Sequence, residues 1–214
     1  MHLKREFSPK KWAIPRKGTA YVARPKSEIE NGIPLLVALR DILKIASNRS
    51  EVKKAIHQAL VLLNGRKVKD ERNSLKIFDV ITIVPSKQNY RLFLMNGGKF
   101  NLEEIPSDEA NKKVSKVLDK KVLKNKRTQL NLLDGNNILS QEKVKTGDSV
   151  LINLNDKKIK KIINLKEGAT ALVFAGKHSG KKGKIKKMIA DKKSIELEGE
   201  SGIFTVLNKQ MMVI

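Results

Sequence analysis

Positive charge runs through the whole sequence and limits how this chain can fold. The 214 residues include 45 Lys or Arg against 22 Asp or Glu, a formal net charge of +23. Segments 1–32, 33–85, 86–165 and 166–214 carry +5, +5, +8 and +5. Such a charge opposes compaction by self-repulsion unless a polyanion lies nearby. A nucleic acid is the first partner to consider, because its phosphates neutralise many cations at once. The alternative is a merely solubilising charge.

Other features exclude several classes of protein. No stretch approaches ~18 consecutive apolar residues, and the opening MHLKREFSPKKW lacks the apolar core of a signal peptide. We therefore expect a soluble cytoplasmic protein with no membrane partner. The absence of cysteine removes disulfides, thiolate zinc sites and cysteine nucleophiles. Only three separated histidines remain, so we expect no enzymatic activity, no catalytic residue, no metal, no cofactor and no small-molecule substrate.

Residues 1–32 combine basic residues with prolines, which fix φ and remove amide donors, and this predicts a basic extended N-terminal arm. Trp12 has two open interpretations: its ring stacks on an RNA base, or it pins the arm to the next domain. The cations are expected to meet phosphates. The candidate RNA-binding residues of the arm are Lys4, Arg5, Lys10, Lys11, Trp12, Arg16 and Lys17.

Residues 33–85 read as two helices followed by a hairpin. Apolar residues recur at helical spacing from Leu35 to Leu43, and Asn48 followed by Glu51 is typical of a capping box that starts a second, basic helix. In VLLNGRKV, Asn64-Gly65 predicts a tight hairpin turn. Further strand is expected up to Ile83.

This arrangement, read across 36–84, resembles the S4 RNA-binding module, in which two helices and the hairpin form one cationic face. By position, that face would include Arg40, Arg49, Lys53, Lys54, Asn64, Arg66 and Lys67, with Gly65 as a turn glycine. The family often has Gly-Asp where this chain has Phe78-Asp79. The departure concerns a turn and leaves the basic face intact.

Residues 86–165 predict a central, mostly-β domain. Short β-like runs such as YRLFLM and SVLINL are separated by turns at DGNN and TGD. A charged stretch at 111–128 is compatible with a helix.

The segment 166–214 contains EGATALVFAGKHSGKKGKIKKM, which looks like a KOW motif of a small SH3-like β-barrel. The resemblance implies turn glycines at Gly176, Gly180 and Gly183. It also implies RNA-binding residues at Lys177, His178, Lys181, Lys182 and Lys184; the alternative is a solvated hairpin. The pattern fails as a nucleotide-binding P-loop, because only three residues separate Gly176 from Gly180.

Taken together, the chain resembles the S4e family of small-subunit ribosomal proteins, found in archaea and eukaryotes. The opening residues HLKR and IPRKGTAYVARP strengthen the likeness, and the short C-terminus favours the archaeal type. The resemblance implies an α+β multi-module fold of arm, S4-like α/β module with its αL motif, central mostly-β domain and KOW barrel. It also implies a structural role in the small ribosomal subunit, with small-subunit ribosomal RNA and neighbouring ribosomal proteins as partners, and no independent homo-oligomer. A non-ribosomal RNA-binding factor of translation or transcription elongation is the alternative.

Lysine outnumbers arginine by 36 to nine. Lysine is a hydrated point charge suited to phosphate contacts, so we expect binding energy that is mostly electrostatic. The few arginines are the expected sites of forked phosphate contacts or stacking.

Overall fold

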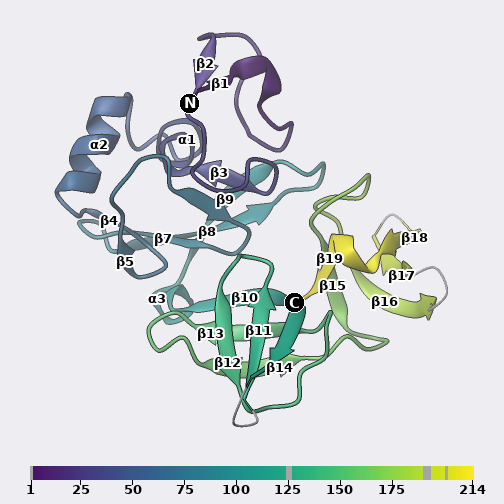
Figure 1. Cartoon of the computed structure of the whole chain (residues 1–214). Helices are drawn as coiled ribbons and strands as arrows, with labels where there is room; N and C mark the ends of the chain where they lie inside the picture. Colours follow the sequence, from purple (N-terminus) through teal and green to yellow (C-terminus); the bar gives the residue numbers. More distant parts are fainter. Residues whose placement is uncertain (1, 124–126, 190–193, 201) are drawn as a thin grey trace. The chain divides into compact units, whose positions relative to one another are not determined.

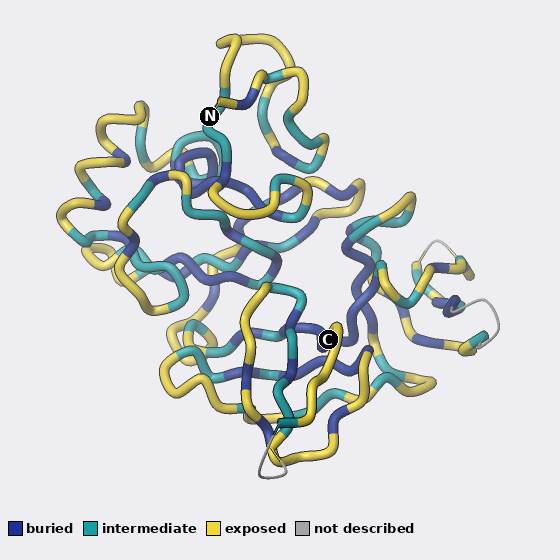
Figure 2. The backbone as a smooth tube through the Cα atoms, viewed as in Figure 1, coloured by how far each residue is buried: buried dark blue, intermediate teal, exposed yellow. Residues whose placement is uncertain are grey.

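The structure is a computed structural model that describes residues 2–123, 127–189, 194–200 and 202–214. The chain divides into two compact units, the first made of residues 1–94 and 99–111 and the second of residues 95–98 and 112–214. Figure 1 shows that strands dominate both units. Many of the buried residues lie in the strands of each unit, while the loops are largely exposed (Figure 2).

The arm is less extended than predicted, because it folds back on itself. Its strands β1 (Leu3–Lys4) and β2 (Tyr21–Val22) pair antiparallel, and a 3-10 turn, η1 (Arg5–Phe7), follows β1. The cause is Arg5, whose guanidinium binds three oxygen atoms of the intervening loop. The arm therefore consists of short extended segments joined by a loop rather than of one continuous extended stretch.

The first unit contains a five-stranded antiparallel sheet in the order β5-β4-β7-β8-β9 and a two-stranded pair, β3-β6. The sheet strands are β4 (Val61–Leu63), β5 (Arg66–Lys67), β7 (Val80–Ile83), β8 (Gln88–Leu94) and β9 (Phe100–Ile105). The pair consists of β3 (Gly32–Pro34) and β6 (Ser74–Lys76), and the short helix α3 (Ser107–Ala110) follows β9.

Two helical segments precede the sheet, as the sequence predicts. The first begins as α1 (Leu35–Val37) and continues as the π-helical turn η2 (Ala38–Ile42), and its residues 35–39 are buried. The second, α2 (Arg49–His57), starts at the predicted cap: the Glu51 amide donates to Asn48 Oδ1 at 3.0 Å. Val52 and Ile56 form its buried stripe.

The hairpin between β4 and β5 turns at Asn64-Gly65, whose φ angles are 50° and 74°. Both values fit the turn type expected for this dipeptide. Phe78, at the position where the S4 module often has glycine, also has a positive φ of 65°. Its neighbour Asp79 is buried and accepts hydrogen bonds from Asn64 Nδ2 and the Lys76 amide, which holds this turn against the hairpin.

In the second unit, the first sheet has the order β12-β11-β10-β13-β14. Its strands are β10 (Lys112–Val122), β11 (Thr128–Leu132), β12 (Asn137–Ser140), β13 (Ser149–Asn153) and β14 (Ile159–Ile163). Residues 112–122 of the stretch that was compatible with a helix form strand β10, and its residue 128 begins β11. The first half of β10 pairs with β13 and its second half with β11, so both edges of the strand are used.

The second sheet of this unit has the order β18-β17-β16-β15-β19. Its strands are β15 (Thr170–Val173), β16 (Lys182–Ile189), β17 (Ser194–Gly199), β18 (Gly202–Leu207) and β19 (Met211–Val213), with a 3-10 turn, η4 (Asn208–Gln210), before the last. Alternate residues such as Ala171, Ile185 and Leu197 form its core.

The glycines of the basic loop have two different roles. Gly176 and Gly180 have φ angles of 85° and 90°, as turn glycines should. Gly183 does not: it lies inside β16, and a Cβ there would come within 2.9 Å of the Glu198 carbonyl oxygen. The prediction of a turn at Gly183 is wrong, and glycine is needed there for close approach of neighbouring backbone.

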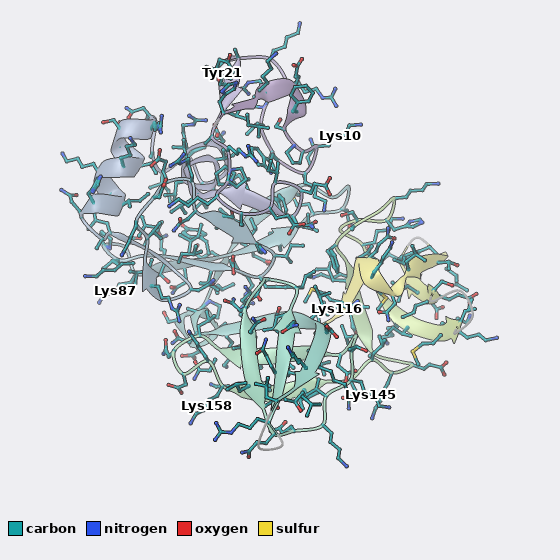
Figure 3. The ribbon with its side chains drawn as sticks, in the orientation of Figure 1. Lys10, Tyr21, Lys87, Lys116, Lys145 and Lys158 are labelled. Carbon is teal, nitrogen blue, oxygen red and sulfur yellow. The ribbon has the colours of Figure 1, made fainter. Side chains whose placement is uncertain are left out.

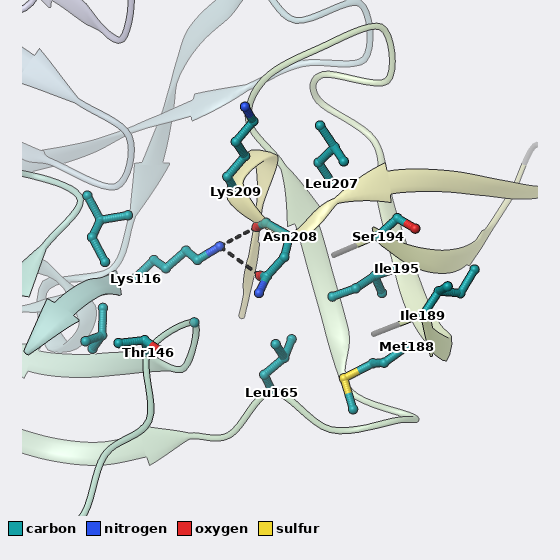
Figure 4. A pocket seen from close by; sticks show the side chains of 13 residues that line it. Lys116, Thr146, Leu165, Met188, Ile189, Ser194, Ile195, Leu207, Asn208 and Lys209 are labelled. Carbon is teal, nitrogen blue, oxygen red and sulfur yellow. Dashed lines mark hydrogen bonds between the residues drawn. The ribbon is translucent and has the colours of Figure 1, made fainter. Parts of the chain in front are cut away.

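Lys116 of β10 links the two sheets of the second unit (Figure 4). Its ammonium group donates to the carbonyl oxygens of Asn208 and Met211 and, at 3.1 Å, to Asn208 Oδ1. Burial lowers the pKa of this amine to about 8. An apolar groove of about 740 Å³ runs beside it, lined in part by Leu165 and Met188.

Candidate nucleic-acid interface

The basic surface of the first unit is built on α2. Because Val52 and Ile56 face the core, helical periodicity places Lys53, Lys54 and His57 on the exposed side. All three are exposed in the structure, and Lys53 and Lys54 were expected on that face.

Beside α2 lies a small hollow of about 280 Å³ in which two arginines are held by acids. Arg49 donates through Nε and Nη2 to Glu71 Oε1, at 3.0 and 2.5 Å, and the Glu71 side chain is 8% exposed. Arg72 donates to Asp70 from Nη2 at 3.1 Å. Burial alone would raise the pKa of Asp70, but hydrogen bonds from Arg72 and Lys26 hold it well below its usual range.

Lys53, His57 and Lys69 complete the lining of this hollow. Two lysines and two arginines against two acids leave a local charge of +2 with His57 neutral. The sequence interpretation missed Lys69 and Arg72, because they sit in the mixed run Lys-Asp-Glu-Arg between strands, where the charges cancel. The signal that could have found them is that all four residues share one loop. An acid that pairs with a neighbouring arginine in such a loop leaves the lysine free to face solvent.

The remaining candidates of the S4-like module lie in different environments. Arg66 and Lys67 are exposed on β5, directly after the hairpin turn. Arg40 is half-buried and forks onto the Asp41 carboxylate at 3.1 and 2.9 Å. Asn64 uses its side chain internally, with Oδ1 accepting from the Val80 amide. The module thus presents lysines and Arg66 outward, while Arg40 and Asn64 serve its own structure.

In the arm, Lys4, Arg5, Arg16 and Lys17 gather around a shallow hollow of about 500 Å³. Lys10 is exposed but does not line it (Figure 3). Lys11 is half-buried, and its Nζ donates to Asn31 Oδ1 at 3.0 Å. Burial lowers the pKa of Lys11 despite the nearby carboxylates of Glu30 and Glu28.

Trp12 takes the anchoring arrangement rather than an exposed one. The residue is 2% exposed, and its indole Nε1 donates to the Gly32 carbonyl oxygen at 3.0 Å. Stacking on a base would require the ring to leave this site. Of its two interpretations, the geometry therefore supports pinning of the arm.

The candidate residues of the basic loop in the second unit also fall into an exposed group and a packed group. Lys177, Lys182 and Lys184 are exposed. His178 stacks on Phe204 with ring centroids 4.7 Å apart, and Lys181 Nζ lies 5.4 Å from the centroid of the same ring. His178 and Lys181 are therefore packed on β18, while the other three project from the loop and from β16.

Within the described ranges, no group of three or more His, Cys, Asp or Glu residues is placed to hold a metal ion. The same part of the chain contains no helix that is both long enough and apolar enough to cross a membrane.

An αL-type helix pair and hairpin with a lysine-rich face, followed by β sheets, define an S4-domain protein of the RNA-binding class. The S4 domain family model matches residues 34–81, and the model of ribosomal family S4e matches residues 86–159. The chain belongs to the S4e family of ribosomal proteins, as its resemblance predicted.

Relatives support this over the full length of the chain. It is 37% identical to the small ribosomal subunit protein eS4 of Methanocella arvoryzae, over 100% of this chain and 93% of that protein. It is 34% identical to eS4 of Halobacterium salinarum, over 100% and 94%. The crystal structure of the 30S ribosomal protein S4e from Thermoplasma acidophilum matches with a TM-score of 0.74 at 27% identity, over 86% of this chain and 95% of that one. These relatives are archaeal, as expected.

Proposed function

We propose that this chain is a structural constituent of the small ribosomal subunit that binds and stabilises small-subunit ribosomal RNA in the cytoplasm. The observation that carries the proposal is full-length similarity to proteins named small ribosomal subunit protein eS4. The charge distribution agrees with it, because every segment of the chain is basic. A protein embedded among RNA strands gains from cations on many faces.

The RNA contacts of the proposal are mainly lysine–phosphate contacts. Support comes from the exposure of Lys53, Lys54 and Lys67 in the first unit and of Lys182 and Lys184 in the second. Lysine heads on flexible stems follow a phosphate backbone without reading bases. Sequence specificity would then come from the shape of the RNA and from the few exposed aromatic rings and arginines.

We further propose that the second sheet of the second unit is a KOW-type, SH3-like barrel. Its strand order, β18-β17-β16-β15-β19, returns the last strand to the first, which agrees with such a barrel. The proposed functional segments are the arm 1–32, the S4-like module 33–85, the central domain 86–165 and the barrel 166–214. Strands β8 and β9, which begin the third segment, pair in the sheet of the first unit.

The proposed partners are ribosomal RNA and neighbouring small-subunit proteins, and the proposed role is structural rather than enzymatic. Support is the family itself, whose named members are ribosomal proteins.

The test is sedimentation of lysate from cells that express the tagged chain, through a gradient at moderate salt. Recovery in one-to-one ratio with small subunits is the expected result. Recovery among free or substoichiometric material would instead indicate a passing RNA-binding factor. A matched variant, Lys53→Glu with Lys54→Glu, should shift the protein to the free fraction, because it reverses two exposed charges of α2.

A further inference from the structure

The chain is poor in aromatic residues, and the exposed ones lie in one place. Among its nine Phe, Trp and Tyr residues, all within the described ranges, only Phe7 and Tyr21 have strongly exposed side chains, at 68% and 55%. Both belong to the arm, and Tyr21 lines the hollow formed by Lys4, Arg5, Arg16 and Lys17. Figure 3 shows Tyr21 at the outer end of the arm.

Arg5 organises this hollow from within. Its Nε donates to the Thr19 carbonyl oxygen at 2.7 Å, its Nη1 to the Pro15 carbonyl oxygen at 2.7 Å and its Nη2 to Thr19 Oγ1 at 2.8 Å. The loop closes tightly, since a Cβ on Gly18 would lie 3.2 Å from the guanidinium carbon. Arg5 therefore acts as a positioning residue, and this revises its predicted role as a direct RNA contact.

The charge at this hollow is not neutralised by the protein. The described residues place no carboxylate in an ion pair with Arg5, Arg16 or Lys17, and the single nearby acid, Glu6, lies 3.9 Å from Lys4. Four cations and one acid leave +3 at the rim of a loop that is held in shape by hydrogen bonds. An unneutralised cluster of cations around a hollow is suited to a phosphate group.

The Tyr21 ring adds a stacking surface. His2 contacts it in a T-shaped arrangement, with centroids 4.7 Å apart and an interplanar angle of 78°, and Tyr21 is still 55% exposed. An exposed aromatic ring beside unneutralised cations is the arrangement by which proteins bind unpaired nucleotides, because bases in a duplex are already stacked.

We propose that residues 4–21 bind an unpaired RNA nucleotide, with its phosphate in the hollow and its base on Tyr21. This inference rests on the proposed function and specifies the class of RNA that the arm takes. It also gives the arm a binding preference that the S4-like module lacks, because the lysines of that module suit the phosphates of RNA in any conformation.

The test compares two fluorescein-labelled RNAs of equal length, an unstructured single strand and a perfect duplex, bound to the full chain and followed by anisotropy. Tyr21→Leu should weaken single-strand binding at least about fivefold and leave duplex binding unchanged, because stacking is worth ~1–3 kcal/mol per base. Tyr21→Phe, which keeps the ring, should bind like the wild type. Circular dichroism checks that each variant is folded.

A second set of variants tests the cluster of cations. Lys17→Ala should weaken single-strand binding more than Lys158→Ala, an exposed lysine outside every proposed contact. Arg5→Lys keeps the charge but loses the fork, so it should weaken binding as much as Lys17→Ala.

The inference would be overturned if Tyr21→Leu weakened binding of both RNAs equally or of neither. It would also be overturned if polyglutamate, at the same concentration of charge as the RNA, competed with the single strand for the protein. Sedimentation with small subunits tests the proposed function separately. If the Tyr21→Leu protein still sediments with small subunits but also binds single strands normally, this inference fails while the proposed function stands.

Discussion

Lys116 brings one of the many positive charges of this chain into the interior of the second unit. Only 3% of the residue is exposed, and its hydrogen-bond partners are carbonyl and amide oxygens rather than a carboxylate. Those bonds favour the charged amine, yet burial costs more and lowers the pKa to about 8 from 10.5. The folded protein therefore releases this proton at a lower pH than the unfolded chain does.

This pKa predicts a pH dependence of stability. Between about pH 8 and about pH 10.5 the unfolded chain binds more protons at Lys116, so the free energy of unfolding should rise with pH. The limit is about 3 kcal/mol, since one pKa unit corresponds to ~1.36 kcal/mol. Urea unfolding of the wild type and of Lys116→Met, across this range, isolates the effect from the other lysines. A difference between the two proteins that stays constant with pH would contradict the assignment.

At Phe78 we expect glycine to destabilise the protein less than alanine does, which is the reverse of the usual order. Its positive φ costs an ordinary residue ~1–2 kcal/mol, whereas glycine adopts it freely. Both Phe78→Gly and Phe78→Ala lose the ring, and we expect the glycine variant to be the more stable by roughly 0.5–1 kcal/mol, measured by urea unfolding. At Phe93, in strand β8, the order should reverse. The same order at both positions would contradict the φ argument.

Residue-scale signals in the sequence were informative where the chemistry is local. Asn48 with Glu51, and Asn64 with Gly65, occupy the predicted cap and turn, because each depends on neighbours within a few positions. The role of Arg5 could not be predicted, since its partners Pro15 and Thr19 lie ten and 14 residues away.

At the scale of elements, β10 lacks the sequence pattern that is typical of a strand. Its buried residues include Lys113, Ser115 and Lys116, so polar side chains occupy positions where a strand usually shows apolar ones. Alternation in the sequence is therefore hidden, and the charge run suggested a helix. The long-range partners that make these lysines acceptable are invisible in the sequence.

One of those partners gives a testable prediction. Lys113 Nζ lies 2.6 Å from Asp134 Oδ2, and both side chains are buried. Burial would raise the pKa of Asp134, but Lys113 and Asn136 lower it below its usual range. Lys113→Met should cost about 3–5 kcal/mol of unfolding free energy, because it leaves a buried carboxylate uncompensated.

The double variant Lys113→Met with Asp134→Leu is the control, and it should recover much of that loss. Lys112→Met, one position earlier and half-buried, should change stability by no more than about 0.5 kcal/mol. Equal effects of Lys112→Met and Lys113→Met in urea unfolding would contradict the role assigned to the pair.

At the scale of the whole molecule, the spread of charge predicts how RNA affinity responds to salt. If both units contact RNA, single substitutions in each should reduce the slope of log K against log salt by roughly 0.7–0.9. Lys54→Ala tests the first unit and Lys184→Ala the second, measured by filter binding to a small-subunit RNA fragment. We expect additive reductions in the double variant. A slope unchanged by Lys184→Ala would exclude a phosphate contact by Lys184.

The family could be predicted for the whole molecule, because motifs such as VLLNGRKV and the glycine-rich loop after Phe174 are contiguous. The hollow beside α2 could not, because it joins Lys69 and Arg72 to a helix more than ten positions earlier. Nor could the packing of His178 on Phe204, which joins two distant segments.

The position of β19 has a consequence for synthesis. It pairs with β15 and supplies the Met211 carbonyl oxygen to Lys116. β15, the first strand of the sheet in sequence, therefore lacks this neighbour until β19, the last strand, has been synthesised. A nascent chain that has emerged only as far as β18 has the free edge of β15 exposed, and Lys116 lacks one of its acceptors. The sheet can thus be completed only after translation has passed Val213. An interrupted chain would present an open strand edge to chaperones or proteases.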